Sequence, residues 1–340
     1  MSRNLLLSLT ASSALLGGAA WADVPKVAAD IAPVHSLVSR VMQGVGEPAL
    51  IVPPGATPHE YSLRPSEASA LQASDLVFWI GPDLTPWMND AIQTLAANAS
   101  VTALMEVDGT TELPFRESVL FEAHSHAEDD AHDHDEDHGH GDDHGHEDAH
   151  DHDHDHDEKA HDDHGHDHGH GAHDPHAWLS PDNGAVWLNA IAAQLSAADP
   201  DNAGTYYANA AAAKEELDTL ITEINTILDP VRGRNFIVFH DAYQYFETSF
   251  GLPASGAISI SDATDPSPAR IAAIQARVKE QDVTCVLSEP QFDPKIVAAV
   301  MDGSEARTGV LDPLGSDLEP GSDLYGAVLR NLAVALADCL

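Results

Sequence analysis

The sequence predicts an α/β protein with two lobes of βα units, each built on a parallel sheet, joined by one long rigid helix. Short apolar runs alternate with amphipathic segments in both halves of the chain, which is the pattern of parallel strands covered by helices. An Ala-rich stretch over residues 201–231 separates the two series, and as one helix it would approach ~40 Å in length. A mature chain of about 320 residues can form two hydrophobic cores.

The first series of βα units precedes a His/Asp-rich segment. Apolar runs predict strands at 24–33, 49–54, 75–82 and 101–107, and amphipathic segments predict helices at 35–45, 64–74 and 84–99. These elements predict an N-terminal lobe over residues 23–200. It contains the His/Asp-rich loop 124–173, whose composition cannot build a core and predicts disorder in the absence of metal.

After this loop the chain returns to helix. Residues 181–199 and 201–231 each begin with an N-cap signal, Pro-Asp or Asp-Asn, and the second gives the linking helix 201–230. Apolar runs then predict strands at 235–241, 254–260, 283–290 and 306–313, each followed by a helical stretch. This second series predicts a C-terminal lobe over residues 231–340.

Residues 1–22 predict a secretory signal peptide. They combine a basic Arg3, an apolar run Leu5–Leu16 and a small-residue pattern ending at Ala22. The apolar run is shorter than the ~20 residues that a membrane-spanning helix needs, so we expect an exported protein that does not span the membrane. In an exported chain, the two cysteines, Cys285 and Cys339, predict a disulfide, with two buried free thiols as the alternative.

The charge of the chain excludes one class of partner. Its formal net charge is -41, of which nineteen acidic residues and one lysine between His124 and His173 contribute -18. Nucleic acid is therefore not expected as a partner, because binding it requires basic side chains that neutralise phosphates.

Polar side chains follow several of the predicted strands. Ligands of open α/β sheets bind beyond the carboxyl ends of the strands. The four histidines outside the loop lie at or just past such an end, or in the loop that follows one: His35, His59, His176 and His240. Three imidazoles with a carboxylate or water suit Zn²⁺, which prefers four tetrahedral ligands. One strand-end histidine could equally be a core or surface residue, but three among so few favour a zinc site.

The chain contains, in this order, the stretches PPGATPHEYSLRPS, DPHAWLSP, FHDAYQYFETSFGL, VTCVLSEPQF and GVLDPLG. Together they resemble the ZnuA family, the periplasmic zinc receptors of bacterial ABC importers within the cluster A-I metal-binding proteins. The resemblance covers essentially the whole mature chain. It implies metal ligands at His59, His176 and His240, a cleft site between two similar lobes, and delivery of the ion to a membrane permease. A histidine rather than a carboxylate at position 240 favours zinc over manganese.

The fourth ligand departs from part of the family pattern. Some members have a glutamate immediately before the first histidine, where this chain has Pro58, and Glu60 lies on the other side. We predict Asp312, which matches the aspartate of many members, with water as the main alternative. Glu289 is predicted to accept a hydrogen bond from an imidazole N–H. His35 is expected to be a satisfied structural histidine, with an indirect support of the site or a transient ligand as the alternative.

The His/Asp-rich loop has its own predicted role. Its eighteen histidines can chelate metal in many arrangements, each with modest affinity because chain entropy opposes it. We expect the loop to collect or buffer additional zinc, and family members often carry such an insert near this position. The alternative is a solvated segment that only adds charge.

These patterns predict a monomeric periplasmic receptor for Zn²⁺ rather than an enzyme. Three histidines with an open fourth position also describe catalytic zinc, with Glu60 or Glu289 as a general base. A zinc-dependent hydrolase or hydratase is therefore one alternative, although the sequence has no H-E-x-x-H or G-x-S-x-G motif. An extracellular metal buffer or adhesin is the other.

Overall fold

The computed structural model describes residues 24–116, 121, 173–259 and 266–340. All of these belong to one compact unit, Met1–Phe121 with Gly171–Leu340. The predicted signal peptide, and the predicted loop 124–173 except for its last residue, lie outside the described residues. Among the described residues, no helix is both long and apolar enough to cross a bilayer.

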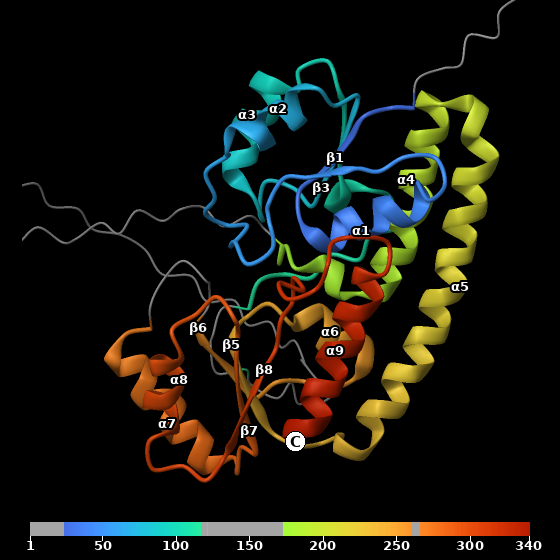
Figure 1. Ribbon diagram of the computed structural model, residues 1–340. Coiled ribbons are helices and arrows are strands. Elements are labelled where there is room, and N and C mark those ends of the chain that lie inside the picture. Colours follow the sequence, from blue (N-terminus) through green and yellow to red (C-terminus); the bar gives the residue numbers. More distant parts are fainter. Residues whose placement is uncertain (1–23, 117–120, 122–172, 260–265) are drawn as a thin grey trace, which may run out of the picture. The chain divides into compact units, whose positions relative to one another are not determined.

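The first sheet has four parallel strands in the order β2-β1-β3-β4, and its strands β1 and β3 are labelled in Figure 1. The strands are β1 (Val27–Ala29), β2 (Ala49–Leu50), β3 (Leu76–Trp79) and β4 (Ser100–Ala103), and the helices between them are α1 (Ala32–Val41), α2 (Pro65–Gln72) and α3 (Pro86–Leu95). Ala28 pairs with Ala49 on one side and Val77 on the other. The central strands β1 and β3 are buried along their whole length, which explains their near-continuous apolar sequence.

The second sheet repeats this topology with the order β6-β5-β7-β8, again all parallel. Its strands are β5 (Phe236–His240), β6 (Gly256–Ser259), β7 (Cys285–Ser288) and β8 (Arg307–Val310), and its helices are α6 (Gln244–Phe250), α7 (Pro268–Glu280), α8 (Pro294–Met301) and α9 (Leu324–Cys339). Seven of the eight apolar runs interpreted as strands contain one, and the run at 101–107 overlaps β4, which begins one residue earlier at Ser100. The predicted α/β fold with two parallel sheets is confirmed.

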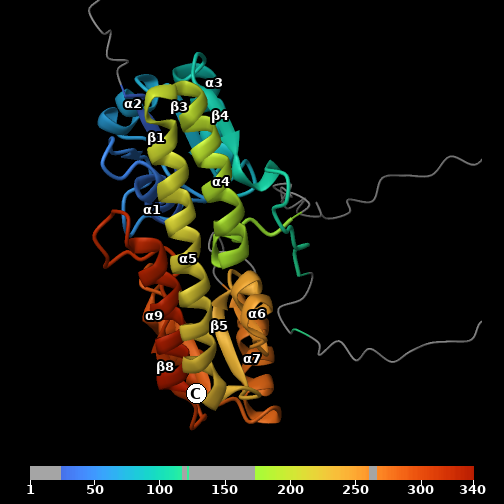
Figure 2. The same ribbon diagram turned by 90° about the vertical axis from the view of Figure 1, so that its right-hand side faces the viewer.

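Two helices connect the sheets, α4 (Pro181–Ala198) and α5 (Ala203–Leu228), and short 3-10 turns flank α5 at Pro200–Asn202 and Asp229–Val231. Both views show α5 passing alongside α4 and on past α9 (Figures 1 and 2). The N-cap of α4 is Ser180, whose hydroxyl accepts from the backbone N–H of Asn183. It lies one residue before the predicted Pro-Asp signal, because a proline without an N–H fits the first helical position.

Two bidentate ion pairs attach α5 to its neighbours. Arg40 of α1 donates to Glu216 at 3.1 and 2.7 Å, and Arg330 of α9 donates to Glu223 at 2.8 and 2.9 Å. Tyr325, also on α9, donates its hydroxyl proton to the carbonyl of Trp178 at 2.8 Å. Helix α9 follows the second sheet in the chain. These contacts nevertheless hold it against α5 and against the turn that leads into α4.

The apolar core follows the same arrangement. One large cluster contains buried residues from β1, α1, α4, α5, β5 and α9, so both sheets contribute to a single core. Two smaller clusters pack elsewhere, one between the second sheet and helices α7 and α8, the other between the first sheet and helices α2 and α3. Because they share the large cluster, the two lobes form one compact unit.

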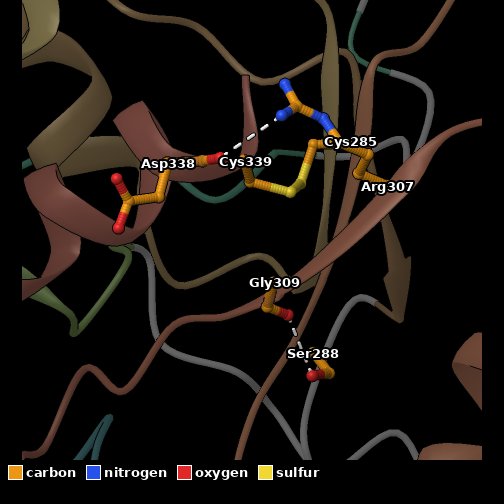
Figure 3. The surroundings of a disulfide bond; sticks show 6 residues. All are labelled: Cys285, Ser288, Arg307, Gly309, Asp338 and Cys339. Carbon is orange, nitrogen blue, oxygen red and sulfur yellow. Dashed lines mark hydrogen bonds between the residues drawn. A yellow bond between two sulfur atoms is a disulfide. The ribbon is translucent and has the colours of Figure 1, made fainter.

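The predicted disulfide between Cys285 and Cys339 is present (Figure 3). It joins the first residue of β7 to the last residue of α9. Beside it, the Arg307 guanidinium donates to the carbonyl of Asp338 at 3.4 Å, and Ser288 donates to the carbonyl of Gly309 at 3.0 Å (Figure 3). The crosslink therefore fastens the C-terminal helix to a central strand of the second sheet.

Candidate metal centre

Three of the four histidines outside the His/Asp-rich loop lie close together, although they come from three separate parts of the chain. His240 is the last residue of β5 and is buried. His176 is also buried, directly before the 3-10 turn Ala177–Leu179 that leads into α4. His59 is partly buried, in the loop between β2 and α2. The ring centroids of His59 and His176 lie 5.5 Å apart, and those of His176 and His240 lie 5.3 Å apart.

These ring separations are close to those of a zinc site. Tetrahedral coordination with Zn–N bonds of about 2.0–2.1 Å places imidazole centroids roughly 5 Å apart. As the side chains stand, no three or more His, Cys, Asp or Glu groups of the described residues are already arranged to hold a metal ion. The two ring separations are therefore near the spacing that zinc requires, while the described side chains as they stand do not form a metal site.

Carboxylates orient two of the three imidazoles. Nδ1 of His176 lies 2.7 Å from Oδ1 of Asp174, and Nδ1 of His240 lies 2.6 Å from Oε1 of Glu289. Since a carboxylate accepts hydrogen bonds, each contact favours the tautomer with its proton on Nδ1, in which Nε2 is the nitrogen that carries the lone pair a metal needs. The contact predicted for Glu289 is present. Asp174 was not predicted; its only signal in the sequence is its place two residues before His176.

Asp174 is itself firmly placed. Its side chain is buried, its backbone N–H donates to the carbonyl of Leu113, and its carbonyl accepts from the Tyr245 hydroxyl at 2.9 Å. Oδ2 of Asp174 has no hydrogen-bond partner among the described residues. Burial raises the pKa of this carboxyl group to about 7, against the opposing effects of a backbone hydrogen bond from His176 and the charge of Arg116.

The loop that carries His59 is held by aromatic side chains. Nε1 of Trp87 on α3 donates to the carbonyl of Pro58 at 2.8 Å. Tyr61 packs on Trp87 with ring centroids 5.8 Å apart, and its hydroxyl donates to Glu67 of α2 at 2.8 Å. These contacts fix the backbone on both sides of His59. Glu60, between them, is exposed.

Asp312 follows β8 and has its carboxylate engaged by the next residues of its own loop. Oδ1 accepts from the backbone N–H groups of Leu314 and Gly315 at 3.1 and 2.9 Å. Oδ2 accepts from both the N–H and the hydroxyl of Ser316 at 2.6 Å. The neighbouring carbonyl of Pro313 accepts from the Trp178 indole at 2.8 Å. The structure thus joins the Asp312 loop to the turn after His176, while four donors occupy the carboxylate.

His35 has the contacts of a structural histidine. It is buried on α1, with Nε2 3.1 Å from the carbonyl of Pro48 and Nδ1 3.4 Å from the Ser39 hydroxyl. Burial lowers its pKa, which keeps the ring neutral. A separate cavity of about 300 Å³ lies among α1, α4, α5 and α9, and its lining residues include none of the four histidines. The imidazole cluster, not this cavity, has the chemistry of a metal centre.

Comparison with known proteins points to one family. A profile of the family described as "ZnuA: Zinc-uptake complex component A periplasmic" matches residues 27–339. The chain is 47% identical over 339 residues to the high-affinity zinc uptake system protein ZnuA of Brucella abortus (strain 2308), covering 98% of both chains. It is 46% identical over 332 residues to the protein of the same name from Paracoccus denitrificans (strain Pd 1222), covering 96% of both.

Solved structures agree with these relatives. A crystal structure of ZnuA matches with a TM-score of 0.69 at 25% identity, covering 93% of this chain and 99% of that one. A zinc-bound deletion mutant of ZnuA matches with a TM-score of 0.68 at 24% identity, covering 93% and 98%.

Proposed function

Because the chain belongs to the ZnuA family, we propose that it is a periplasmic receptor that captures Zn²⁺ and delivers it to the membrane permease of an ABC importer. The observation that supports this most directly is the imidazole cluster. His176 and His240 have their Nδ1 atoms engaged by Asp174 and Glu289, and His59 lies within reach of His176. Neutral Nε2 atoms are suitable zinc ligands.

The proposed ligands are His59, His176, His240 and Asp312. For Asp312 to bind the ion, one oxygen must exchange a hydrogen bond from the 314–316 loop for the metal, because that loop supplies four donors to the carboxylate. A water molecule in the fourth position is the alternative. An aspartate ligand would make zinc affinity sensitive to Asp312→Ala, whereas a water ligand would leave it nearly unchanged.

The mechanism is reversible capture with no chemical step on a substrate. The acceptors on Nδ1 hold the imidazoles before the ion arrives, so little side-chain entropy is lost on binding. The His/Asp-rich loop 124–173 is proposed to collect or buffer further zinc ions at weaker sites. We also propose that the receptor acts as a monomer and that residues 1–22 direct its export.

Deleting residues 124–172 is expected to leave the tight zinc site intact. The proposed ligands are held by contacts within the described residues, so the shortened protein should keep one tightly bound ion and lose only weaker ones. Titration against a competing zinc chelator would measure both the number of ions and the tightest affinity. The matched variant is His59→Ala/His176→Ala/His240→Ala in the full chain. Loss of the tight site on deletion, with its retention in the triple variant, would reverse this assignment.

Zinc affinity is expected to fall as pH drops below about 7. Ligand imidazoles must be neutral, and an imidazole ordinarily gains a proton near pH 6.5. Burial raises the pKa of Asp174 to about 7, so acid also protonates the acceptor that orients His176. Each ligand imidazole takes up a proton when zinc leaves. With three such imidazoles, zinc affinity should fall by up to about a thousandfold per pH unit. Chelator competition from about pH 8 to about pH 5.5 tests this, and constant affinity over that range would contradict the ligand set.

A further inference from the structure

Residues 111–116, here called the arm, connect the first sheet's lobe to helix α6 of the second. At the start of the arm, the backbone N–H of Thr111 donates to Oδ1 of Asn183 on α4 at 2.8 Å, and Nδ2 of Asn183 donates back to the Thr111 carbonyl at 3.0 Å. Further along, the N–H of Leu113 donates to the Tyr245 hydroxyl on α6 at 2.9 Å. The arm ends in the side chain of Arg116, which also contacts α6.

Arg116 makes an extended set of charged contacts in a mostly buried place. Its guanidinium donates to both oxygens of Glu247, at 3.3 and 2.7 Å, and to Oδ1 of Asp241 at 3.1 Å. It lies 3.9 Å from the ring centroid of Phe121. The exposed fractions of the side chains are 19% for Arg116, 7% for Asp241 and 4% for Glu247. Charge-assisted, two-point contacts in such surroundings fix geometry as well as adding energy.

The two acids connect Arg116 to a proposed zinc ligand. Asp241 directly follows His240 at the end of β5. Glu247 lies on α6 and also accepts a hydrogen bond from the backbone N–H of Ala254 at 3.0 Å. A movement of the Glu247 side chain would therefore disturb the loop that precedes β6. By holding both acids, the guanidinium fixes the backbone immediately after His240.

The same helix and arm also hold the residue that orients His176. The Tyr245 hydroxyl accepts from Leu113 of the arm and donates to the carbonyl of Asp174. Asp174 in turn engages Nδ1 of His176. One continuous set of contacts therefore joins the supports of two proposed ligands: Arg116 acts on the side of His240, and Leu113 with Tyr245 on the side of His176.

The positive charge of Arg116 also compensates the negative charges of the buried acids around it. Three acids with little exposure lie around it, Asp174, Asp241 and Glu247, and its guanidinium donates hydrogen bonds to two of them, Asp241 and Glu247. Removing one partner from such a group leaves buried charge uncompensated. The acids would then move towards water, and this movement would disturb the backbone that they fix.

We propose that Arg116 is a positioning residue for zinc capture, which sets the spacing of His176 and His240 through Asp241, Glu247 and the arm. This inference rests on the proposed zinc site. It assigns no bond between Arg116 and the ion. A lysine at this position would keep the positive charge but lose the planar fork that spans two acids.

The test compares Arg116→Met and Arg116→Lys with the wild-type full-length protein. The matched control is Arg330→Met, which removes an arginine of equal bidentate geometry on α9 whose partner Glu223 is on α5. Zinc affinity is measured by chelator competition. The absorption spectrum of the Co²⁺-loaded tight site reports ligand geometry, which a purely structural role would leave unchanged. We expect Arg116→Met to weaken zinc about 10- to 100-fold, as for other groups that orient ligands, and to alter the Co²⁺ spectrum.

Arg116→Lys should recover part of the affinity, and Arg330→Met should match wild type in both measurements. If Arg116→Met is poorly folded, the variant Arg116→Met/Glu247→Gln, which removes one buried negative charge together with the arginine, provides the same comparison. Wild-type affinity and an unchanged Co²⁺ spectrum in a folded Arg116→Met protein would overturn the positioning role. If the wild-type protein lacks a tight site, or His176→Ala binds zinc as tightly as wild type, the proposed function itself fails.

Discussion

Replacing His176 with alanine is expected to weaken the tight zinc site about a hundredfold or more, while replacing His173 leaves it unchanged. His176 is buried beside His59 and His240, and its Nδ1 is held by Asp174. Zinc sites with four ligands bind with about 10–16 kcal/mol in total, so one ligand accounts for roughly 3 kcal/mol. The loss in affinity should therefore be about a hundredfold or more.

His173 is a stringent control because it lies only three residues earlier. Its side chain is 43% exposed and pairs with Glu112 at 3.2 Å. Chelator competition on His173→Ala, His176→Ala and the wild-type protein under identical conditions would measure the difference. Equal losses in the two variants would mean that this whole stretch binds zinc as one flexible element, and the division between an interchangeable loop and a fixed ligand would be wrong.

Much of the fold follows from the sequence because buried parallel strands are almost continuously apolar. The strand expected over 75–82 contains β3 (Leu76–Trp79), whose residues are all buried. The first and last residues of each strand were less predictable than the presence of the strand. In the run at 49–54 the strand itself spans only Ala49–Leu50, although the N–H groups of Ile51 and Val52 still donate to the carbonyls of Ala29 and Asp30. Prolines at positions 53 and 54 have no N–H to continue these hydrogen bonds further.

The sequence showed the candidate ligands, which stay a prediction, but only one of their supports. Histidines and carboxylates at strand ends are visible in the sequence, and Glu289 contacts an imidazole as expected. Arg116 could not be inferred, because its partners are 125 and 131 residues away in the chain. The hydrogen bonds to Asp312 depend on the backbone path of residues 314–316, which neither residue types nor their spacing specify.

Removing the disulfide is expected to lower the free energy of unfolding by roughly 4 kcal/mol, because the crosslink closes a long loop in the chain-entropy model. Cys285 and Cys339 are 54 residues apart, and both are buried. The loss would lower the unfolding temperature by roughly 5–10 °C for a protein of this size. Denaturant unfolding of Cys285→Ala/Cys339→Ala measures the change. The reduced wild-type protein is the control that separates loss of the crosslink from the small cavities that alanine leaves.

Repeating the unfolding measurement with zinc bound tests whether the disulfide also supports the metal site, because β7 leads directly to Glu289, the partner of His240. Zinc at a hundred times its dissociation constant adds about 2.7 kcal/mol to any folded protein that binds it. The register of β7 is also fixed by its pairing with β5 and β8 and by the Ser288–Gly309 hydrogen bond (Figure 3). We therefore expect the same stability difference between the disulfide-bonded and alanine proteins with and without zinc. A difference that grew when zinc was added would mean that the crosslink also holds Glu289 in place against His240.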